Sequence, residues 1–446
     1  MWSDQHTGYR GREVIRGLRW WIVVLLFFGA ALNYLDRNVL AILEPKIQPE
    51  IGWTPEQWGL INGMFWLSYA GLAFVAGRFL DRVGAKLGYG LMLAWWGAAC
   101  ALHGVVGSVF GFMALRFVLG VGEAGVIPAT AKATAEWFPK QERGLAYGLA
   151  IGGMMIAGIA APPITGALAT SLGWRWAFFT TGGTCALWLA GWSLLYGLPA
   201  KHRRITQAER DYILSAQEAE RREREEAPVE AAGPRIGMLK LIGRPQLWGI
   251  AAARFLGDPV WAFYMAWTPK YMADARGLDF KTIANIAWLP FVASAAGSIA
   301  SGWISSFLIK RGMEPVRARK AMLIGGAALM PVGSLAFFAE SLEAAMGCLC
   351  VAGFGHIVWV VATQTLPSDM FPGRYVGAAT GAAQTTGSIG NVLALYGVGY
   401  VVSHFSYLPV FILAGLMHPI GTVLMLVTVR NTSALTAWIR GHDSAA

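Results

Sequence analysis

Two apolar stretches of the sequence carry charged residues at a depth where a lipid bilayer tolerates few. The first holds only the neighbours Asp36 and Arg37, and a later one holds only Arg116 and Glu123. A charged side chain at the bilayer centre costs roughly 2.5–3.5 kcal/mol, so its default interpretation is functional. Arg116 and Glu123 lie two helical turns apart and share one face of their helix. Basic and acidic groups that face one polar cavity suit a carrier of small anions coupled to protons.

The four residues are of three types, and each type fits this chemistry. Arginine suits a carboxylate because its planar fork makes two parallel hydrogen bonds and keeps its charge. Burial and a nearby arginine pull the proton affinity of a carboxyl group in opposite directions, which lets Asp36 and Glu123 titrate as a cavity changes its exposure. The alternative is a purely structural ion pair. It is strongest for Asp36 with Arg37, because neighbouring residues on a helix point about 100° apart and can face different helices.

The composition places these residues in a membrane protein. The chain has 446 residues, of which 55% are hydrophobic and 14% charged, with a mean hydropathy of +0.47. This excludes a soluble domain with a polar shell. Runs of about 20 apolar residues are long enough to cross a bilayer. Twelve are predicted, at 20–43, 57–80, 87–108, 110–131, 144–170, 175–198, 246–273, 283–309, 321–339, 343–366, 376–403 and 408–429. The first run is too long for a cleavable signal and is expected to stay as a span.

The distribution of the 36 Lys and Arg residues explains the net charge of +10 without a nucleic-acid partner. With the N-terminus inside, most of them fall in cytoplasmic segments, as the positive-inside rule requires. The outer loops hold Lys46, Arg175, Lys270, Arg276 and Lys281. This predicts that both termini are cytoplasmic. The four cysteines fall inside spans without metal-site spacing, and no metal or cofactor is expected.

One long polar segment divides the spans six and six. The predicted organisation is an N-terminal six-helix bundle at 1–198, a cytoplasmic linker at 199–244 and a C-terminal six-helix bundle at 245–446. Thr206 and Glu209 form a capping-box start for a short amphipathic helix on the inner membrane surface. A flexible tether through Pro228 and Pro234 would follow. A solvated linker with no specific role is the alternative.

An internal repeat supports the two halves. Trp137-Phe138-Pro139, followed by Gly144 and Gly148, recurs 233 residues later as Met370-Phe371-Pro372, followed by Gly377 and Gly381. The same register places Glu123 on His356. Six spans in each half make the repeats parallel, related by an axis along the membrane normal.

The loop after the second span has a recognisable pattern of glycine and charge. It includes Gly77, Asp81, Arg82, Gly84 and Lys86. Glycine allows close helix approach, and Asp81 can cap or pair at a helix end. This pattern resembles the loop signature of the major facilitator superfamily, and we interpret it as a latch between helices. Simple positive-inside charge is the alternative.

Within that superfamily the chain resembles the anion:cation symporter family, most closely its hexuronate transporters. The similarity is carried by Gly17-Leu18-Arg19-Trp20, Asn33-Tyr34-Leu35-Asp36-Arg37-Asn38, Gly122-Glu123-Ala124, Ile127-Pro128-Ala129, Glu136-Trp137-Phe138-Pro139, Glu142-Arg143, Arg254-Phe255-Leu256, Pro259-Val260-Trp261, Ala287-Trp288-Leu289-Pro290 and Gly353-Phe354-Gly355-His356. The resemblance implies uptake of sugar acids together with protons. It implies that Arg37 and Arg116 bind the carboxylate, that Asp36 and Glu123 titrate, and that Tyr34 and Tyr69 line the sugar site. Related aldonate carriers use an amide in the eleventh span, where Gln384 or Asn391 could serve.

The second half offers further candidates. His356, Trp359 and Thr363 repeat on one helical face, which suits a sugar's hydroxyl groups and apolar face. A lone histidine that satisfies a neighbouring helix is the equal alternative. Trp261 and Tyr264 are candidates for the sugar site, although aromatics at this spacing also pack. The pair Arg254 and Asp258, one turn apart, is interpreted as structural or gating.

The sequence therefore predicts an all-α membrane protein with twelve transmembrane helices in two six-helix parallel-repeat bundles, the major facilitator fold. The expected function is proton-coupled symport of a hexuronate by alternating access in a bacterial inner membrane, with the protein as a monomer. Alternatives are an aldonate or aldarate (galactonate, glucarate), another small organic anion, or a drug:proton antiporter. Two buried arginines count against the antiporter, because pumps for lipophilic cations need acidic cavities. A membrane-embedded enzyme or sensor is disfavoured, since no span carries a metal cluster or a nucleophile–base pair.

Overall fold

Helices carry all twelve of the predicted apolar runs. The computed structural model describes residues 15–226, 244–371 and 373–429, and its regular structure there is helical apart from one isolated bridge between Ile15 and Ile205. The first half contains α1 (Leu18–Ile51), α2 (Pro55–Leu102), α3 (Val109–Glu123), α4 (Val126–Trp137), α5 (Lys140–Ser171) and α6 (Trp174–Leu195). The second half contains α9 (Pro245–Asp274), α10 (Phe280–Ile286), α11 (Leu289–Lys310), α12 (Pro315–Ser334) with η3 (Leu335–Phe337), α13 (Leu342–Met370), α14 (Gly373–His404) and α15 (Leu408–Thr428).

Runs and helices do not correspond one to one. The long α2 holds the two runs at 57–80 and 87–108, and Gly84 interrupts it with φ 82° and ψ 164°, values that favour glycine. The run at 110–131 lies across α3 and α4, and the run at 283–309 lies across α10 and α11. By length and hydropathy alone, seven of the described helical segments can each cross a bilayer, and the bent pair within α2 adds an eighth. The helices α6, α9 and α14 are not among these segments, because glycines, hydroxyl side chains and charges lower their mean hydropathy.

The internal repeat reappears in the ends of the helices. α4 ends at Trp137 and α13 ends at Met370, positions 233 residues apart. The residue after each helix, Phe138 or Phe371, is extended, with φ −127° and −107°. The helices that follow, α5 and α14, both contain 32 residues. The repeat in sequence is therefore also a repeat in local structure.

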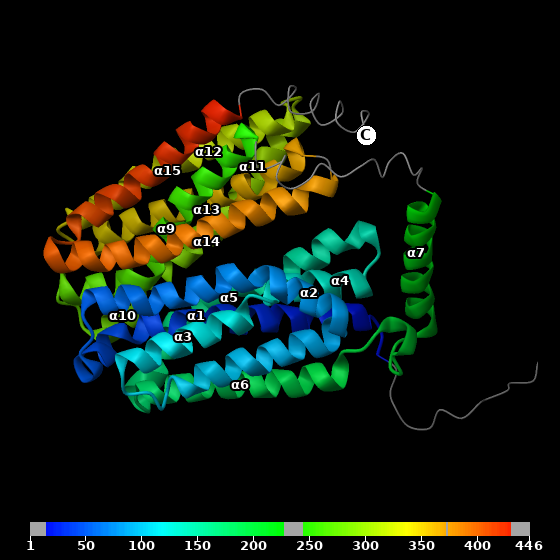
Figure 1. The fold of residues 1–446 in the computed structure, drawn as a ribbon, viewed down its shortest axis with the longest axis horizontal. Helices are drawn as coiled ribbons and strands as arrows, with labels where there is room; N and C mark the ends of the chain where they lie inside the picture. The colour runs from blue at the N-terminus through cyan, green and yellow to red at the C-terminus, as the bar shows by residue number, and fades with distance from the viewer. Residues whose placement is uncertain (1–14, 227–243, 372, 430–446) are drawn as a thin grey trace, which may run out of the picture.

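Figure 1 shows two groups of long helices lying side by side, with α1–α6 in one and α9–α15 in the other. Within the first group α1 packs on α5 and α6, and within the second α13 packs on α11 and α12. The two groups meet through α2 with α14, α1 with α9, and α5 with α10 and α11. Gly59 of α2 is needed for this contact, because a Cβ there would collide with the carbonyl oxygen of Leu395 in α14.

The linker segment forms η1 (Pro199–Lys201) and then α7 (Gln207–Glu226), which stands across one end of the first group (Figure 1). Glu209 accepts hydrogen bonds from the backbone N–H groups of Leu18 and Arg19, at 3.0 and 3.1 Å. Glu220, three turns further along α7, accepts one from Lys140 N at 3.2 Å. These carboxylates cap the free N–H groups at the starts of α1 and α5. The tether predicted through Pro228 and Pro234 lies outside the described residues.

Candidate functional site

Arg37 and Glu123 form an ion pair in the interior of the first helix group. Arg37 donates from Nε and Nη2 to Glu123 Oε2, at 3.0 and 2.8 Å. The Glu123 side chain is fully buried, whereas 16% of the Arg37 side chain is exposed. Asn33, one turn before Arg37, accepts a third hydrogen bond at 3.4 Å. The second carboxylate oxygen of Glu123, Oε1, has no hydrogen-bond partner among the described residues.

Aromatic rings surround the Arg37 guanidinium. Its Cζ lies 4.8 Å from the ring centroid of Phe65, 5.3 Å from that of Tyr69 and 5.6 Å from that of Trp66. The ring of Tyr34 lies 5.8 Å away on the same helix. Such cation–π contacts hold the guanidinium while leaving hydrogen-bonding N–H groups for another partner.

Arg116 approaches the same point from α3. Its Nη1 and Nη2 both donate to the backbone carbonyl of Arg37 at 3.2 Å, and Nη2 also reaches Asn62 Oδ1 at 3.4 Å. These acceptors are neutral, and Arg116 forms no ion pair within the part of the chain that the structure describes. Its Nε is buried and has no hydrogen-bond partner in the described segments. Arg116 is thus a buried cation whose partners among the described residues are neutral oxygens.

Asp36 faces away from this group. Its Oδ2 accepts a hydrogen bond from the thiol of Cys185 in α6 at 3.3 Å, and its Oδ1 has no partner among the described residues. Asp36 is buried. The structure therefore brings Arg37, Arg116 and Glu123 together, whereas the Asp36 carboxylate is directed to Cys185 of α6.

Side chains of both helix groups meet next to Arg37. Trp261 Nε1 of α9 donates to the Tyr34 hydroxyl at 3.3 Å, and this hydroxyl donates to Met265 Sδ at 3.4 Å. Two small cavities lie on this interface, and both have Asn38 and Met265 in their walls. The cavity of about 30 Å³ is lined by Arg37 and Arg116, and the other, of about 40 Å³, by aromatic residues of the second group. Each has room for only a few water molecules.

His356 stacks on Trp261 with ring centroids 5.1 Å apart and an interplanar angle of 6°. On its other side, His356 Nδ1 lies 3.0 Å from Nε2 of His418 in α15. The remaining nitrogen of His418, Nδ1, is buried and finds no hydrogen-bond partner in the part of the chain that the structure describes. A buried N–H group without a hydrogen-bond partner is rarer than a buried acceptor without one. This favours an unprotonated Nδ1 in His418, so that its Nε2 donates to His356. The proton of a neutral His356 then sits on Nε2.

Of four further predicted residues, Tyr264 lines one of these cavities, whereas Trp359, Thr363 and Asn391 line neither. Trp359 is fully buried in the second group and donates from Nε1 to Thr422 at 2.8 Å. Thr363 bonds carbonyl groups of its own helix. Tyr264 lines the 40 Å³ cavity, but its hydroxyl is directed to where a Gly333 side chain would sit. Asn391 is buried in α14, with Oδ1 lacking a partner among the described residues.

The predicted pair of Arg254 and Asp258 forms within α9, with Nη2 and Oδ2 2.9 Å apart. Arg254 also donates to Gln384 of α14 at 3.1 Å. The pair therefore ties two helices of the same group together. In the loop region around Gly84, Asp81 pairs with Lys132 of α4 at 3.3 Å. Gly77, Arg82 and Lys86 lie on the same helix as Asp81.

A second buried ion pair connects the two groups at the end remote from α7. Lys270 Nζ of α9 lies 2.9 Å from Glu44 Oε1 of α1 and 3.0 Å from Asp274 Oδ2 on its own helix. Trp53 Nε1 also donates to Glu44 Oε1, at 3.2 Å. Lys270 was assigned to an outer loop from the sequence, and the structure instead buries it in α9. This network, which we name the end lock, joins the two groups at that end.

The comparisons with known proteins agree with this architecture. The sequence model of the Major Facilitator Superfamily matches residues 26–316 and 313–444, which is most of the chain. The chain belongs to the major facilitator superfamily. It is a multi-pass membrane transporter and not an enzyme, and the predicted fold and family are confirmed.

Relatives in this superfamily transport sugar acids. The chain is 30% identical over 435 residues to the hexuronate transporter of Escherichia coli K12, covering 97% of this chain and 99% of that one. It is 33% identical over 340 residues to the galacturonate transporter of Dickeya chrysanthemi, covering 76% and 96%. A bacterial homologue of the human lysosomal transporter Spinster, inward-facing and unoccupied, has the same fold, with a TM-score of 0.70, 17% identity, and coverage of 93% and 96%.

Sequence reasoning missed His418, Asn62 and the pair of Glu44 and Lys270. Asn62 was not recognised as a site residue, because a single amide in an apolar run is commonly a packing residue. Glu44 falls one residue beyond the first predicted run, and Lys270 lies near the end of another, so both resembled ordinary flanking charges.

Proposed function

We propose that this protein takes up a hexuronate, such as glucuronate or galacturonate, together with protons across a bacterial inner membrane. Both termini would lie in the cytoplasm, because most Lys and Arg residues gather on that side. The observation that carries the proposal is the convergence of Arg37 and Arg116 on one cavity between the helix groups. The similarity to hexuronate and galacturonate transporters supports it.

Arg116 is the first partner for the cargo carboxylate. Its charge meets only neutral oxygens, so an incoming anion adds a charge-assisted hydrogen bond without having to displace a carboxylate. The rings of Phe65, Trp66 and Tyr69 next to Arg37 offer apolar faces to the sugar. The two cavities are too small for a six-carbon acid in this conformation, so Met265 must move or the groups must separate. A methionine side chain is flexible enough for the first.

Glu123 provides a simple mechanism of coupling. While ionised, it occupies both Nε and Nη2 of Arg37. A proton on Glu123 neutralises its half of the ion pair and frees Arg37 for the cargo carboxylate. The proton and the anion then bind cooperatively. Each of them removes the contact between Glu123 and Arg37, which competes with the binding of the other.

Asp36 is the candidate for a second proton. It is buried beside Cys185 and has no cationic partner among the described residues, so a negative charge there is costly. One proton with one monoanion moves no net charge, and the pH gradient then supplies about 1.4 kcal/mol per unit. A second proton would add roughly 2.3 kcal/mol per 100 mV of membrane potential.

The test uses purified protein in proteoliposomes with labelled glucuronate. Glu123→Gln imitates the protonated acid, so it should retain exchange of internal for external glucuronate and lose the part of the pH-driven accumulation that Glu123 couples, which is all of it in the one-proton version. Arg116→Ala should lose both, because it removes the cationic partner of the carboxylate. Arg175→Gln is the matched control, since Arg175 is a partly exposed arginine that pairs with Glu50 away from the cavity. Full pH-driven accumulation by Glu123→Gln would overturn the coupling mechanism.

Electrical recording separates the two stoichiometries. Addition of glucuronate should produce an inward current if Asp36 carries a second proton, and Asp36→Asn should remove it. Electrically silent, proton-coupled uptake would rule out the two-proton version. A panel with galacturonate, galactonate, glucarate and a lipophilic cation distinguishes the alternative cargoes, and competition by the cation but by none of the sugar acids would favour an antiporter.

A further inference from the structure

A large groove on the first helix group is separate from the site above. It has a volume of about 1070 Å³ and lies between the second half of α2 and the end of α6, next to η1. Its described lining comes only from the first group and the linker, so it is not on the interface where the two groups meet. The cargo site therefore does not explain it.

The groove combines two chemistries. Its floor is apolar and continues onto the lipid-facing surface, where Leu87, Leu91 and Leu194 are 54%, 50% and 74% exposed. Its rim is basic and consists of Arg82, Lys86, Lys201, Arg203 and Arg204. We name these five residues the basic rim.

The acidic residues of the groove do not neutralise the basic rim. Asp81 is paired with Lys132 at 3.3 Å, and Glu136 Oε2 accepts a hydrogen bond from the Tyr196 hydroxyl at 2.6 Å. Within the described ranges, the side chains of the basic rim form no ion pair. Five cations therefore face one groove, and no described carboxylate pairs with any of them.

His202 fixes part of this rim. Its Nδ1 accepts a hydrogen bond from Arg204 N at 3.2 Å, so its Nε2 is the nitrogen that donates to the Leu195 carbonyl, at 3.0 Å. Burial lowers the pKa of His202, the hydrogen bond to Leu195 opposes this, and the nearby Arg204 and Lys86 lower it further. A neutral histidine thus ties the turn to the end of α6 and holds Arg203 and Arg204 beside the groove.

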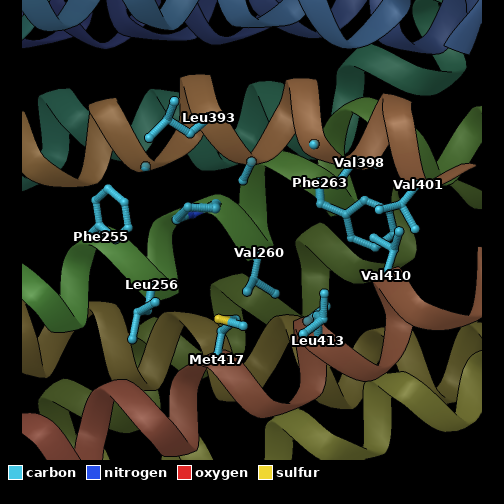
Figure 2. Close-up of a pocket in the computed structure, with 15 residues that line it drawn as sticks. Phe255, Leu256, Val260, Phe263, Leu393, Val398, Val401, Val410, Leu413 and Met417 are labelled. Carbon is cyan, nitrogen blue, oxygen red and sulfur yellow. The ribbon is translucent and has the colours of Figure 1, made fainter. Parts of the chain in front are cut away.

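A second groove provides an internal comparison. Figure 2 shows it between α9, α14 and α15, with Phe255, Leu256, Val260 and Leu413 among its lining residues. All fifteen lining residues are apolar or glycine. This groove suits an acyl chain of any lipid, whereas the first adds five cations at the mouth of an apolar floor.

We propose that the groove beside the basic rim binds one anionic phospholipid, with its phosphate on the rim and an acyl chain on the apolar floor. A free phosphate ion would use the cations and leave the floor unused. Basic pockets between transmembrane helices on the cytoplasmic side suit anionic head groups. The proposal is independent of the cargo, and it requires only that this groove lies at membrane depth.

The test is native mass spectrometry of the delipidated full-length protein, titrated with phosphatidylglycerol or phosphatidylcholine of identical acyl chains. We expect at least a tenfold preference for phosphatidylglycerol. Lys201→Gln, Arg203→Gln and Arg204→Gln combined should remove the preference, at roughly fivefold per cation. The matched control combines Lys310→Gln, Arg311→Gln and Arg317→Gln, which removes three cations from the second group and should keep the preference.

Two further arms identify the ligand. Leu91→Gln keeps the rim but places an amide on the floor, so it should weaken both lipids. Glycerol phosphate should compete poorly, because it lacks an acyl chain. Equal binding of both lipids by the unaltered protein, equal loss of preference in the control variant, or glycerol phosphate binding as tightly as phosphatidylglycerol would each overturn the proposal. If the triple variant fails to fold, each of the three single variants should lose about fivefold of the preference for phosphatidylglycerol. An unchanged preference in all three would also overturn the proposal.

Discussion

The end lock predicts how the protein opens at the end remote from α7. Lys270 and Glu44 join α9 to α1 and are both buried, with side chains 5% and 1% exposed. Removing one partner of a buried ion pair typically costs 3–5 kcal/mol, because the other charge stays buried and unpaired. Lys270→Met imposes this cost on the closed conformation alone, since opening hydrates Glu44. The equilibrium should shift toward the open conformation by roughly 10²- to 10⁴-fold.

The two partners are not equivalent. Glu44→Gln leaves Lys270 paired with Asp274 at 3.0 Å, so the lysine keeps a carboxylate. Its shift should be closer to tenfold, the value of an ordinary charge-assisted hydrogen bond. The combination of Glu44→Gln with Lys270→Met removes both charges of the pair, and a neutral replacement for a buried pair is often tolerated. The double variant should therefore be more closed than Lys270→Met alone.

Distances between spin labels at Val105 and Phe405 report this opening. Both side chains are exposed, at 65% and 72%. Val105 follows α2 of the first group and Phe405 follows α14 of the second, both at this end. Serine replaces Cys348 and Cys350 in every sample to limit unwanted labelling. An unchanged distance distribution for Lys270→Met, or a double variant as open as the single one, would refute the lock.

Three shorter predictions concern other contacts. Glu209→Ala should lower the free energy of unfolding by about 1–2 kcal/mol, because two N–H groups of α1 lose their cap; thermal unfolding measures this, and no change would contradict the capping role. Gly59→Leu should favour the open spin-label distribution, since the side chain collides with α14, and an unchanged distribution would mean that the helices can repack. His418→Leu should raise the glucuronate KM severalfold, whereas His418→Gln, which retains a donor, should restore it; equal KM values would exclude positioning through His356.

The helices and their repeat were predictable because both depend on local patterns. Apolar runs of bilayer length predicted every spanning segment, and the recurrence of Phe138 at Phe371 predicted two parallel halves, whose α4 and α13 end at matching positions. The break between α3 and α4 was not predicted, since the run at 110–131 stays apolar across it. Hydropathy shows that a segment can span the membrane and does not show where its backbone changes direction.

The site residues show a different limit. Composition and spacing singled out Arg37, Arg116 and Glu123, which the structure places together. Neither composition nor spacing showed that Arg37 pairs with Glu123, or that Asp36 faces Cys185. Those contacts depend on how three helices are rotated relative to one another. Trp359 shared a face with His356 in sequence, yet it is fully buried and bonds Thr422. Helical periodicity defines a face, and packing decides what that face contacts.

The repeat also explains why the two halves of the proposed site differ. Arg116 and Glu123 correspond, at 233 residues, to Leu349 and His356. Arg116 lines one of the two interface cavities, and Leu349 lines the other. One half therefore supplies charge, and the other supplies apolar surface and neutral donors. A sugar acid has the same asymmetry, with a carboxylate at one end of a neutral ring. Such a cargo would contact both halves only when they close around it, so its binding energy would be available for the change between open and closed conformations.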